Sequence, residues 1–160
     1  MIENDNIFIY DDAFGKAEQV GRQIWYDLLT NGNYNIADLY FTPSKYDKMD
    51  GYMSAPYQNN KVWFEIKRRN IKSTDYEEGG YILEKNKYDA LHSVYCNGDY
   101  GWYINIFDDC IKIWDVSLLT PKFEWKNCTS TTVQNYKKGE KPKLVHLIKE
   151  QPIITIPMSK

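Results

Sequence analysis

Apolar side chains recur at helical spacing near the beginning of the chain, between residues 13 and 30. They lie three or four residues apart, which is the spacing of one face of an α-helix. The members of this stripe are Ala17, Val20, Ile24 and Leu28. Asp11-Asp12 can cap the start of such a helix, and Asn31-Gly32-Asn33 can end it. The pattern predicts one amphipathic helix over residues 13–30.

Short runs rich in apolar and aromatic residues follow this helix. They cover residues 36–41, 49–53 and 62–67. Pro43-Ser44 separates the first two runs, and Pro56 with Asn59-Asn60 separates the last two. Proline and asparagine favour turns at such positions, so we expect three short strands joined by turns.

A second helical pattern covers residues 83–95, after a polar loop over residues 70–80. Asn97-Gly98 can end this helix, because glycine readily adopts the left-handed conformation of a helix C-terminus. Lys87 and Leu91 lie four residues apart and therefore share one face. Lys87 is thus expected on the face that Leu91 buries.

Two further apolar runs, at residues 102–107 and 111–116, flank the turn signal Asp108-Asp109. They are expected to form paired strands. The pattern weakens beyond Pro121. The weaker candidates there are edge strands at residues 143–148 and 153–156 and a mobile loop at residues 137–141.

The order helix, three strands, helix, strand, strand predicts an α/β (α+β) protein with a mixed central β-sheet flanked by helices. A chain of 160 residues is long enough for one domain that buries roughly two-thirds of its unfolded surface. We expect a single domain over residues 1–160, with its core at about residues 13–116 and a C-terminal extension at residues 117–160.

Composition narrows the choice of partners and compartment. The formal net charge is −2, so a nucleic acid would have to be attracted by a local basic patch. The three cysteines have no two-residue spacing, which argues against a zinc knuckle and a disulfide framework and favours a reducing compartment. The chain also lacks a basic leader and a run of roughly 18 apolar residues. We expect a soluble, cytoplasmic protein with no membrane partner.

The run over residues 62–67 carries an acid and an amine within an otherwise apolar strand. Alternate side chains of a strand lie on opposite faces, so Glu65 and Lys67 would lie side by side on one face. Asp50 lies 15 residues before Glu65. A hairpin between the two segments would bring the two carboxylates together. Two carboxylates and a lysine can hold and use a magnesium ion.

Asp50, followed by Glu65-Ile66-Lys67, resembles the motif of the PD-(D/E)XK nuclease superfamily. The resemblance covers roughly residues 13–107, where a helix, a three-strand meander, a second helix and a further strand are expected in that order. One departure is Met49, which stands where many members have proline. The resemblance implies a restriction-endonuclease-like fold and Mg2+-dependent deoxyribonuclease activity.

The resemblance also implies a role for each residue of the motif. Asp50 and Glu65 would bind Mg2+, or Mn2+, and the backbone carbonyl of Ile66 would be an additional ligand. Lys67 would position or help to deprotonate the attacking water. Simpler explanations exist for each: Asp50-Gly51 can be a turn, and Glu65 and Lys67 can form an exposed ion pair of little energetic weight.

Glu18 and Lys87 are weaker candidates for the catalytic site. Some branches of the family carry an acid on the first helix that completes the metal site, and some carry a lysine on the second helix near the phosphate. Glu18 can equally pair with Arg22, four residues later on the helix surface. Lys87 can equally lay its stem over apolar surface while its ammonium reaches water.

Basic and aromatic residues around the motif suggest a nucleic-acid partner. Arg68, Arg69 and Lys72 extend the motif strand into a basic loop, where contact with DNA phosphates is expected. A second basic run, equally well explained as a solvated loop, consists of Lys137, Lys138, Lys141 and Lys143. Four aromatic residues could stack on an unpaired base, although packing is the commoner use: Tyr52, Tyr57, Trp63 and Tyr81.

These features predict a metal-dependent nuclease that hydrolyses phosphodiester bonds in DNA. The alternative is a catalytically inactive nuclease-fold protein that binds nucleic acid or a protein partner. A third hypothesis is a small interaction protein that uses a tyrosine-rich surface. Fold analogy alone suggests a homodimer.

Overall fold

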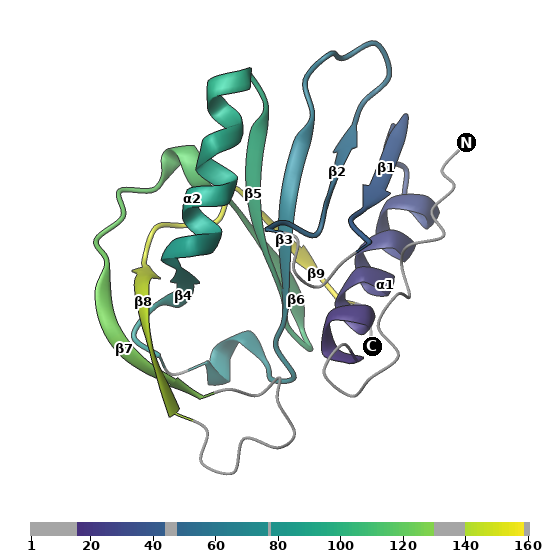
Figure 1. Ribbon diagram of the computed structural model, residues 1–160. Helices are drawn as coiled ribbons and strands as arrows, with labels where there is room; N and C mark the ends of the chain where they lie inside the picture. The colour runs from purple at the N-terminus through teal and green to yellow at the C-terminus, as the bar shows by residue number, and fades with distance from the viewer. Residues whose placement is uncertain (1–15, 44–47, 77, 130–139, 159–160) are drawn as a thin grey trace.

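A six-stranded mixed sheet lies at the centre of the computed structural model, which describes residues 16–43, 48–76, 78–129 and 140–158. Its strands are β1 (Asp38–Phe41), β2 (Gly51–Ser54), β3 (Val62–Arg68), β5 (Tyr100–Ile106), β6 (Cys110–Asp115) and β9 (Ile154–Pro157), in the spatial order β1-β2-β3-β5-β6-β9. β3 and β5 run parallel, whereas the other neighbouring strands are antiparallel. Figure 1 shows helix α1 (Lys16–Asn31) on one face of this sheet and helix α2 (Lys85–Ser93) on the other.

The first helix and the three-strand meander confirm the prediction for the motif region. β1, β2 and β3 form consecutive antiparallel pairs, and Gly51 lies opposite Phe64. The predicted helix start at residues 13–15, its cap Asp11-Asp12 and the turn residue Ser44 lie outside the described residues. The predicted edge strand at residues 153–156 is present as β9, and the runs at residues 102–107 and 111–116 are β5 and β6.

The buried face of α1 differs from the stripe expected from spacing. Val20 is 48% exposed, whereas Arg22, Trp25 and Leu29 are buried. The physical reason is the close approach of the helix to β3 at Gly21, where an added Cβ would lie 3.0 Å from the Ile66 side chain. This contact turns the face with Trp25 toward the sheet, where Trp25 packs in the same cluster as Ile66.

The second predicted helix begins later than expected. Residues Leu83 and Glu84 belong to strand β4 (Tyr81–Glu84), and α2 begins at Lys85. The helical spacing of this segment concealed a short strand whose pairing partner, β8 (Glu140–Ile148), lies far along the chain. Leu83 and Ile148 are fully buried in one apolar cluster with Leu91 of α2, so tertiary packing decides this boundary.

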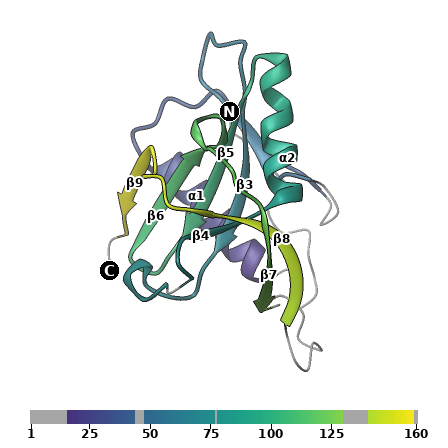
Figure 2. The ribbon, with the colours of Figure 1, turned by 90° about the vertical axis from the view of Figure 1, so that its left-hand side faces the viewer.

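A second, three-stranded sheet has the order β4-β8-β7 and includes β7 (Glu124–Thr129). Figure 2 shows β7 and β8 side by side, extending away from α2. The strand expected at residues 143–148 is confirmed, but it is the central strand of this sheet and not an edge. Of the expected loop at residues 137–141, residues 137–139 lie outside the described residues, and Glu140 and Lys141 are part of β8.

The architecture is thus α+β, with a mixed six-stranded sheet, a separate three-stranded sheet and two α-helices in the part of the chain that the structure describes. Neither helix in these ranges is long and apolar enough to cross a membrane.

Candidate active site

Asp50 lies immediately before strand β2, at the open end of the β2–β3 hairpin. Its backbone N–H donates to the Phe64 carbonyl at 2.9 Å, and Gly51 begins the β2 ladder beside it. The backbone N–H of Ile66 then donates to Asp50 Oδ2 at 2.7 Å. The Asp50 carboxylate therefore accepts the hydrogen bond of the Ile66 N–H in place of a backbone carbonyl of β2. Asp50 is 7% exposed, which excludes the simple exposed turn as an explanation.

Arg22 fixes the other oxygen of this carboxylate. Its Nε and Nη2 atoms lie 3.1 Å and 3.0 Å from Asp50 Oδ1. Nη1 donates to the Thr42 carbonyl at 2.8 Å. Arg22 is only 1% exposed, so this is a buried, charge-assisted contact between α1 and the hairpin. The sequence showed Arg22 only as a helix-surface partner of Glu18, because nothing local indicated that it reaches a residue 28 positions later.

Glu65 is a buried acid that contacts two lysines. It is 4% exposed, and its Oε1 lies 3.2 Å from Lys67 Nζ and 3.0 Å from Lys87 Nζ. Lys67 comes from the same strand face, and Lys87 comes from the first turns of α2. The Lys87 ammonium also lies 3.4 Å from the Lys48 carbonyl. An exposed surface ion pair is therefore excluded for Glu65, and the Lys87 ammonium is held against Glu65 by an ion pair.

Glu18 faces the same cluster from α1. Burial, and then the nearby charge of Asp50, raise the pKa of Glu18. The cations of Lys67, Arg22 and Lys87 lower this pKa in part, which means that their charges also act on Glu18. The structure thus brings together the five residues for which the sequence suggested a catalytic role: Glu18, Asp50, Glu65, Lys67 and Lys87.

The two central residues of the cluster have perturbed proton affinities. Burial, and then repulsion from Asp50, raise the pKa of Glu65 to about 7, although Lys67 and Lys87 oppose this shift. For Lys67, burial lowers the pKa, but attraction to Glu65 and other negative groups outweighs burial and leaves the pKa raised. Lys67 is consequently a firmly protonated ammonium at neutral pH. Glu65 is an acid whose charged form needs a nearby cation.

The oxygen donors fit a small divalent cation. Asp50, immediately before β2, and Glu65 of β3 supply carboxylates, and the Ile66 carbonyl belongs to the residue between Glu65 and Lys67. Among the described residues, no three Asp, Glu, His or Cys side chains are grouped to hold a metal ion. Magnesium does not require three, because it keeps several waters and accepts one or two carboxylates. The raised pKa of Glu65 fits the same donor set, because a divalent cation would relieve repulsion between the two carboxylates.

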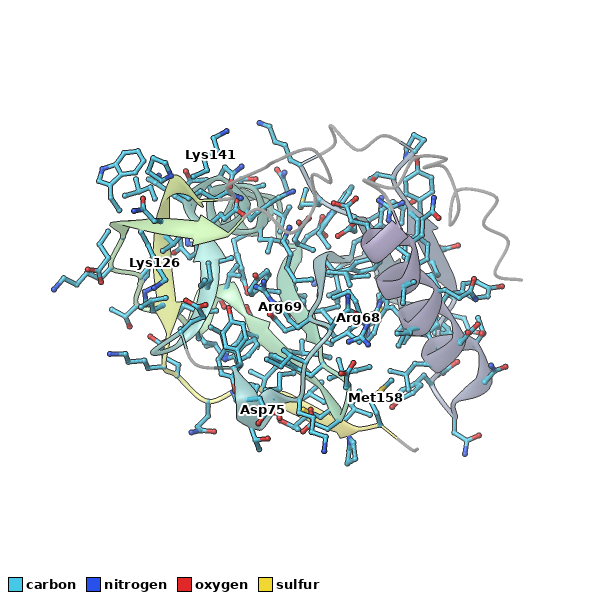
Figure 3. All side chains as sticks on the ribbon, turned by 90° about the horizontal axis from the view of Figure 1, so that it is seen from below. Arg68, Arg69, Asp75, Lys126, Lys141 and Met158 are labelled. Carbon is cyan, nitrogen blue, oxygen red and sulfur yellow. The ribbon has the colours of Figure 1, made fainter. Side chains whose placement is uncertain are left out.

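The three residues expected to contact DNA phosphates occupy different environments. Figure 3 shows Arg68 toward α1 and Arg69 on the opposite side, toward the second sheet. Arg68 donates to Asp108 Oδ1 at 2.5 Å and to the Ile106 carbonyl at 3.0 Å. Arg69 donates to Asn105 at 3.1 Å and to the Tyr103 hydroxyl at 3.3 Å. Both guanidinium groups therefore have partners within the protein, whereas Lys72 is exposed.

One acidic residue of the second sheet also acts on the site. Glu84 accepts a contact of 2.7 Å from Lys143 Nζ and contributes to the raised pKa of Lys67. Lys143 was expected only as part of a basic run, and Glu84 was not identified from the sequence, because β4 was hidden within the predicted helix. The only available signal was the apolar pair Tyr81 and Leu83, which has the two-residue period of a strand.

Comparisons of the chain with protein-family models, curated proteins and solved structures gave no match. Its function is therefore inferred from the chemistry of this cluster.

Proposed function

We propose that the protein is a metal-dependent nuclease that hydrolyses phosphodiester bonds in DNA and has a restriction-endonuclease-like core. The observation that carries this proposal is the cluster of buried Asp50 and Glu65 with Lys67. These three side chains come from a hairpin and its last strand, as the motif requires. The element order α1, β1, β2, β3, α2, β5, with the short strand β4 of the second sheet inserted before α2, supports the same fold family.

In this function, Asp50 and Glu65 would hold Mg2+ or Mn2+ together with the Ile66 carbonyl. Such an ion polarises a phosphate and makes its bound water more acidic. Lys67, already protonated and held by Glu65, would donate hydrogen bonds to the attacking water and to a phosphate oxygen. Its positive charge would stabilise the negative charge that develops on the phosphate.

Glu18 and Lys87 would complete the polar environment of the scissile phosphate. Glu18 lies close enough to Asp50 for their charges to repel, so it adds negative charge where the cation would bind. Lys87 reaches the cluster from α2 and would contact a phosphate oxygen while it remains beside Glu65.

Cleavage assays test this proposal directly. Labelled linear, single-stranded, circular and branched DNA would be incubated with Mg2+ or Mn2+ and with native protein, Glu65→Ala or Lys67→Ala. We expect cleavage by the native protein and none by either variant. Lys85→Ala is the control for loss of a lysine, because Lys85 pairs with the exposed Asp89. Native-like cleavage by a correctly folded Glu65→Ala or Lys67→Ala variant would overturn the proposal.

A noncatalytic nucleic-acid-binding or protein-binding function is the second candidate, and one observation favours it. Each central acid already has a cation beside it: Arg22 for Asp50, and Lys67 with Lys87 for Glu65. Such a network can be stable without a metal ion. This candidate predicts DNA or protein binding in EDTA and no cleavage when Mg2+ is added.

A further inference from the structure

Three aromatic rings form a row across the first three strands of the central sheet. Tyr40 lies opposite Tyr52 in the β1–β2 ladder, and Tyr52 lies opposite Trp63 in the β2–β3 ladder. The ring centroids of Tyr40 and Tyr52 are 5.3 Å apart in a stacked arrangement. Those of Tyr52 and Trp63 are 4.9 Å apart and tilted by 58°. We call Tyr40, Tyr52 and Trp63 the aromatic row.

The aromatic row lies on the same face of the sheet as Glu65 and Lys67. The alternate residues Leu39, Phe41 and Met53 point into the apolar cluster beneath α1. The row therefore points to the opposite face. On β3, Trp63 is two residues before Glu65, a separation of about 7 Å along a strand. A strand of nucleic acid with one phosphate at Glu65 and Lys67 would pass over the row.

The row is not part of the closed core. Tyr40 is 37% exposed, and Tyr52 and Trp63 are partly exposed. Figure 1 shows α2 over β5, away from β1 and β2. Cross-strand aromatic pairs stabilise sheets, but that role alone does not require partly exposed aromatic residues beside a polar site.

Polar contacts orient the row, and a lysine ammonium lies against one of its rings. Trp63 Nε1 donates to Asp99 Oδ2 at 3.2 Å, which holds the indole in one orientation. The backbone N–H of Lys61 donates to the other oxygen of Asp99 at 2.9 Å. The Lys61 ammonium lies 4.4 Å from the Tyr52 ring centroid. Aromatic faces beside a lysine are the combination that binds bases and phosphates of an unpaired strand.

We propose that the aromatic row stacks on an unpaired base of the DNA strand whose adjacent phosphate lies at Glu65 and Lys67. The inference rests on the proposed nuclease function and deepens it, because it assigns the substrate class: single-stranded DNA, or an unpaired strand at a branch. The base lies on Tyr52 or Trp63, and the Lys61 ammonium moves from the ring face to the neighbouring phosphate. A paired base cannot occupy this position, because both of its faces are covered within the duplex.

Equilibrium binding tests the row separately from cleavage. Fluorescein-labelled oligo(dT) and a duplex of equal length would be titrated with Lys67→Ala protein in EDTA, alone and combined with Tyr52→Leu or Trp63→Leu. Each row variant should bind oligo(dT) roughly 5- to 150-fold more weakly, with duplex binding changed less than about twofold. Tyr52→Phe keeps the ring and should bind as well as its parent. Tyr34→Leu is the control, because Tyr34 is an exposed tyrosine between α1 and β1, outside the row.

The outcomes separate the two proposals. Unchanged oligo(dT) binding by folded Tyr52→Leu and Trp63→Leu, an equal loss for single strand and duplex, or a loss in Tyr52→Phe would overturn the stacking role. Any of these results would leave the nuclease proposal standing if the native protein cleaves DNA and Lys67→Ala does not. If the native protein does not cleave DNA but the row variants show the expected loss of oligo(dT) binding, the stacking role of the row stands and the nuclease proposal is overturned. Melting curves of each variant identify any loss that is caused by unfolding.

Discussion

Arg22 and Asp50 form a buried ion pair that joins α1 to the start of β2, with Nη2 and Oδ1 3.0 Å apart. Asp50 also accepts the backbone N–H of Ile66, so one carboxylate connects the helix, the hairpin and the motif strand. This arrangement makes the shape of the candidate active site depend on a residue outside the motif. It also means that Asp50 has little freedom to turn away from the site.

Replacement of one member of this pair should destabilise the protein more than replacement of both. Arg22→Met leaves the buried Asp50 charge without its guanidinium, and a loss of roughly 3–5 kcal/mol in unfolding free energy is expected. Arg22→Met combined with Asp50→Asn should recover part of that loss, because the uncompensated charge is gone. Urea unfolding of the four proteins forms a double-mutant cycle. Strictly additive losses would contradict this prediction.

The raised pKa of Glu65 predicts a specific pH dependence of stability in EDTA. The pKa of Glu65 in the native state is about 7, so the native state keeps the proton up to about that pH, whereas the unfolded state releases it near the ordinary glutamate pKa of 4.5. Stability should therefore fall as pH rises between these values, by up to about 3 kcal/mol, since each pKa unit corresponds to about 1.4 kcal/mol. Glu65→Gln lacks this titration. Urea unfolding of both proteins should show that the native protein loses stability relative to Glu65→Gln across this range, and parallel pH curves would refute the assignment.

Alternation and spacing were sufficient to predict the elements that carry the motif. Glu65 and Lys67 share a face because strand geometry requires it, and Asp50 lies beside them because the hairpin register follows from the two apolar runs. The positions of Glu18 and Lys87 followed from helical spacing and from the resemblance. Local sequence rules therefore describe much of the candidate site.

The parts that could not be predicted depend on contacts between distant segments. β4 is a strand because it pairs with β8, and β7 carries mostly polar residues, with Trp125 exposed. The orientation of α1 depends on how closely Gly21 approaches β3. The helical spacing of apolar residues does not reveal this distance. The partners of Arg68 and Arg69, which lie within the protein, belong to the same class of long-range contact.

Lys87 should weaken the binding of Mg2+ but increase the rate of cleavage. Its ammonium lies 3.0 Å from Glu65 Oε1, where it competes for the carboxylate that would bind Mg2+. Lys87→Met should lower the half-saturating Mg2+ concentration and reduce the maximal cleavage rate roughly 10- to 100-fold, because a phosphate contact is lost. Lys85→Met serves as the control on the same helix. A higher Mg2+ requirement in Lys87→Met would show that the two cations do not compete.

Gly101 should be required for the position of α2 and therefore for activity. A Cβ at this position would lie 2.2 Å from the Leu91 carbonyl, so Gly101→Ala has to displace the backbone of α2. Overpacking of this kind costs roughly 1–3 kcal/mol. Because α2 carries Lys87, cleavage should fall more than the loss of folded protein explains.

Gly98→Ala is the control for Gly101→Ala, because it should lower stability without displacing α2. Gly98 has a φ of +79°, and its added Cβ would meet no atom within 4 Å. The left-handed backbone should cost Gly98→Ala about 1–2 kcal/mol, similar to Gly101→Ala, without movement of Lys87. Thermal melting and cleavage of both variants, measured at a temperature where each is folded, should show reduced activity in Gly101→Ala alone. Equal activities would mean that the position of α2 does not control the site.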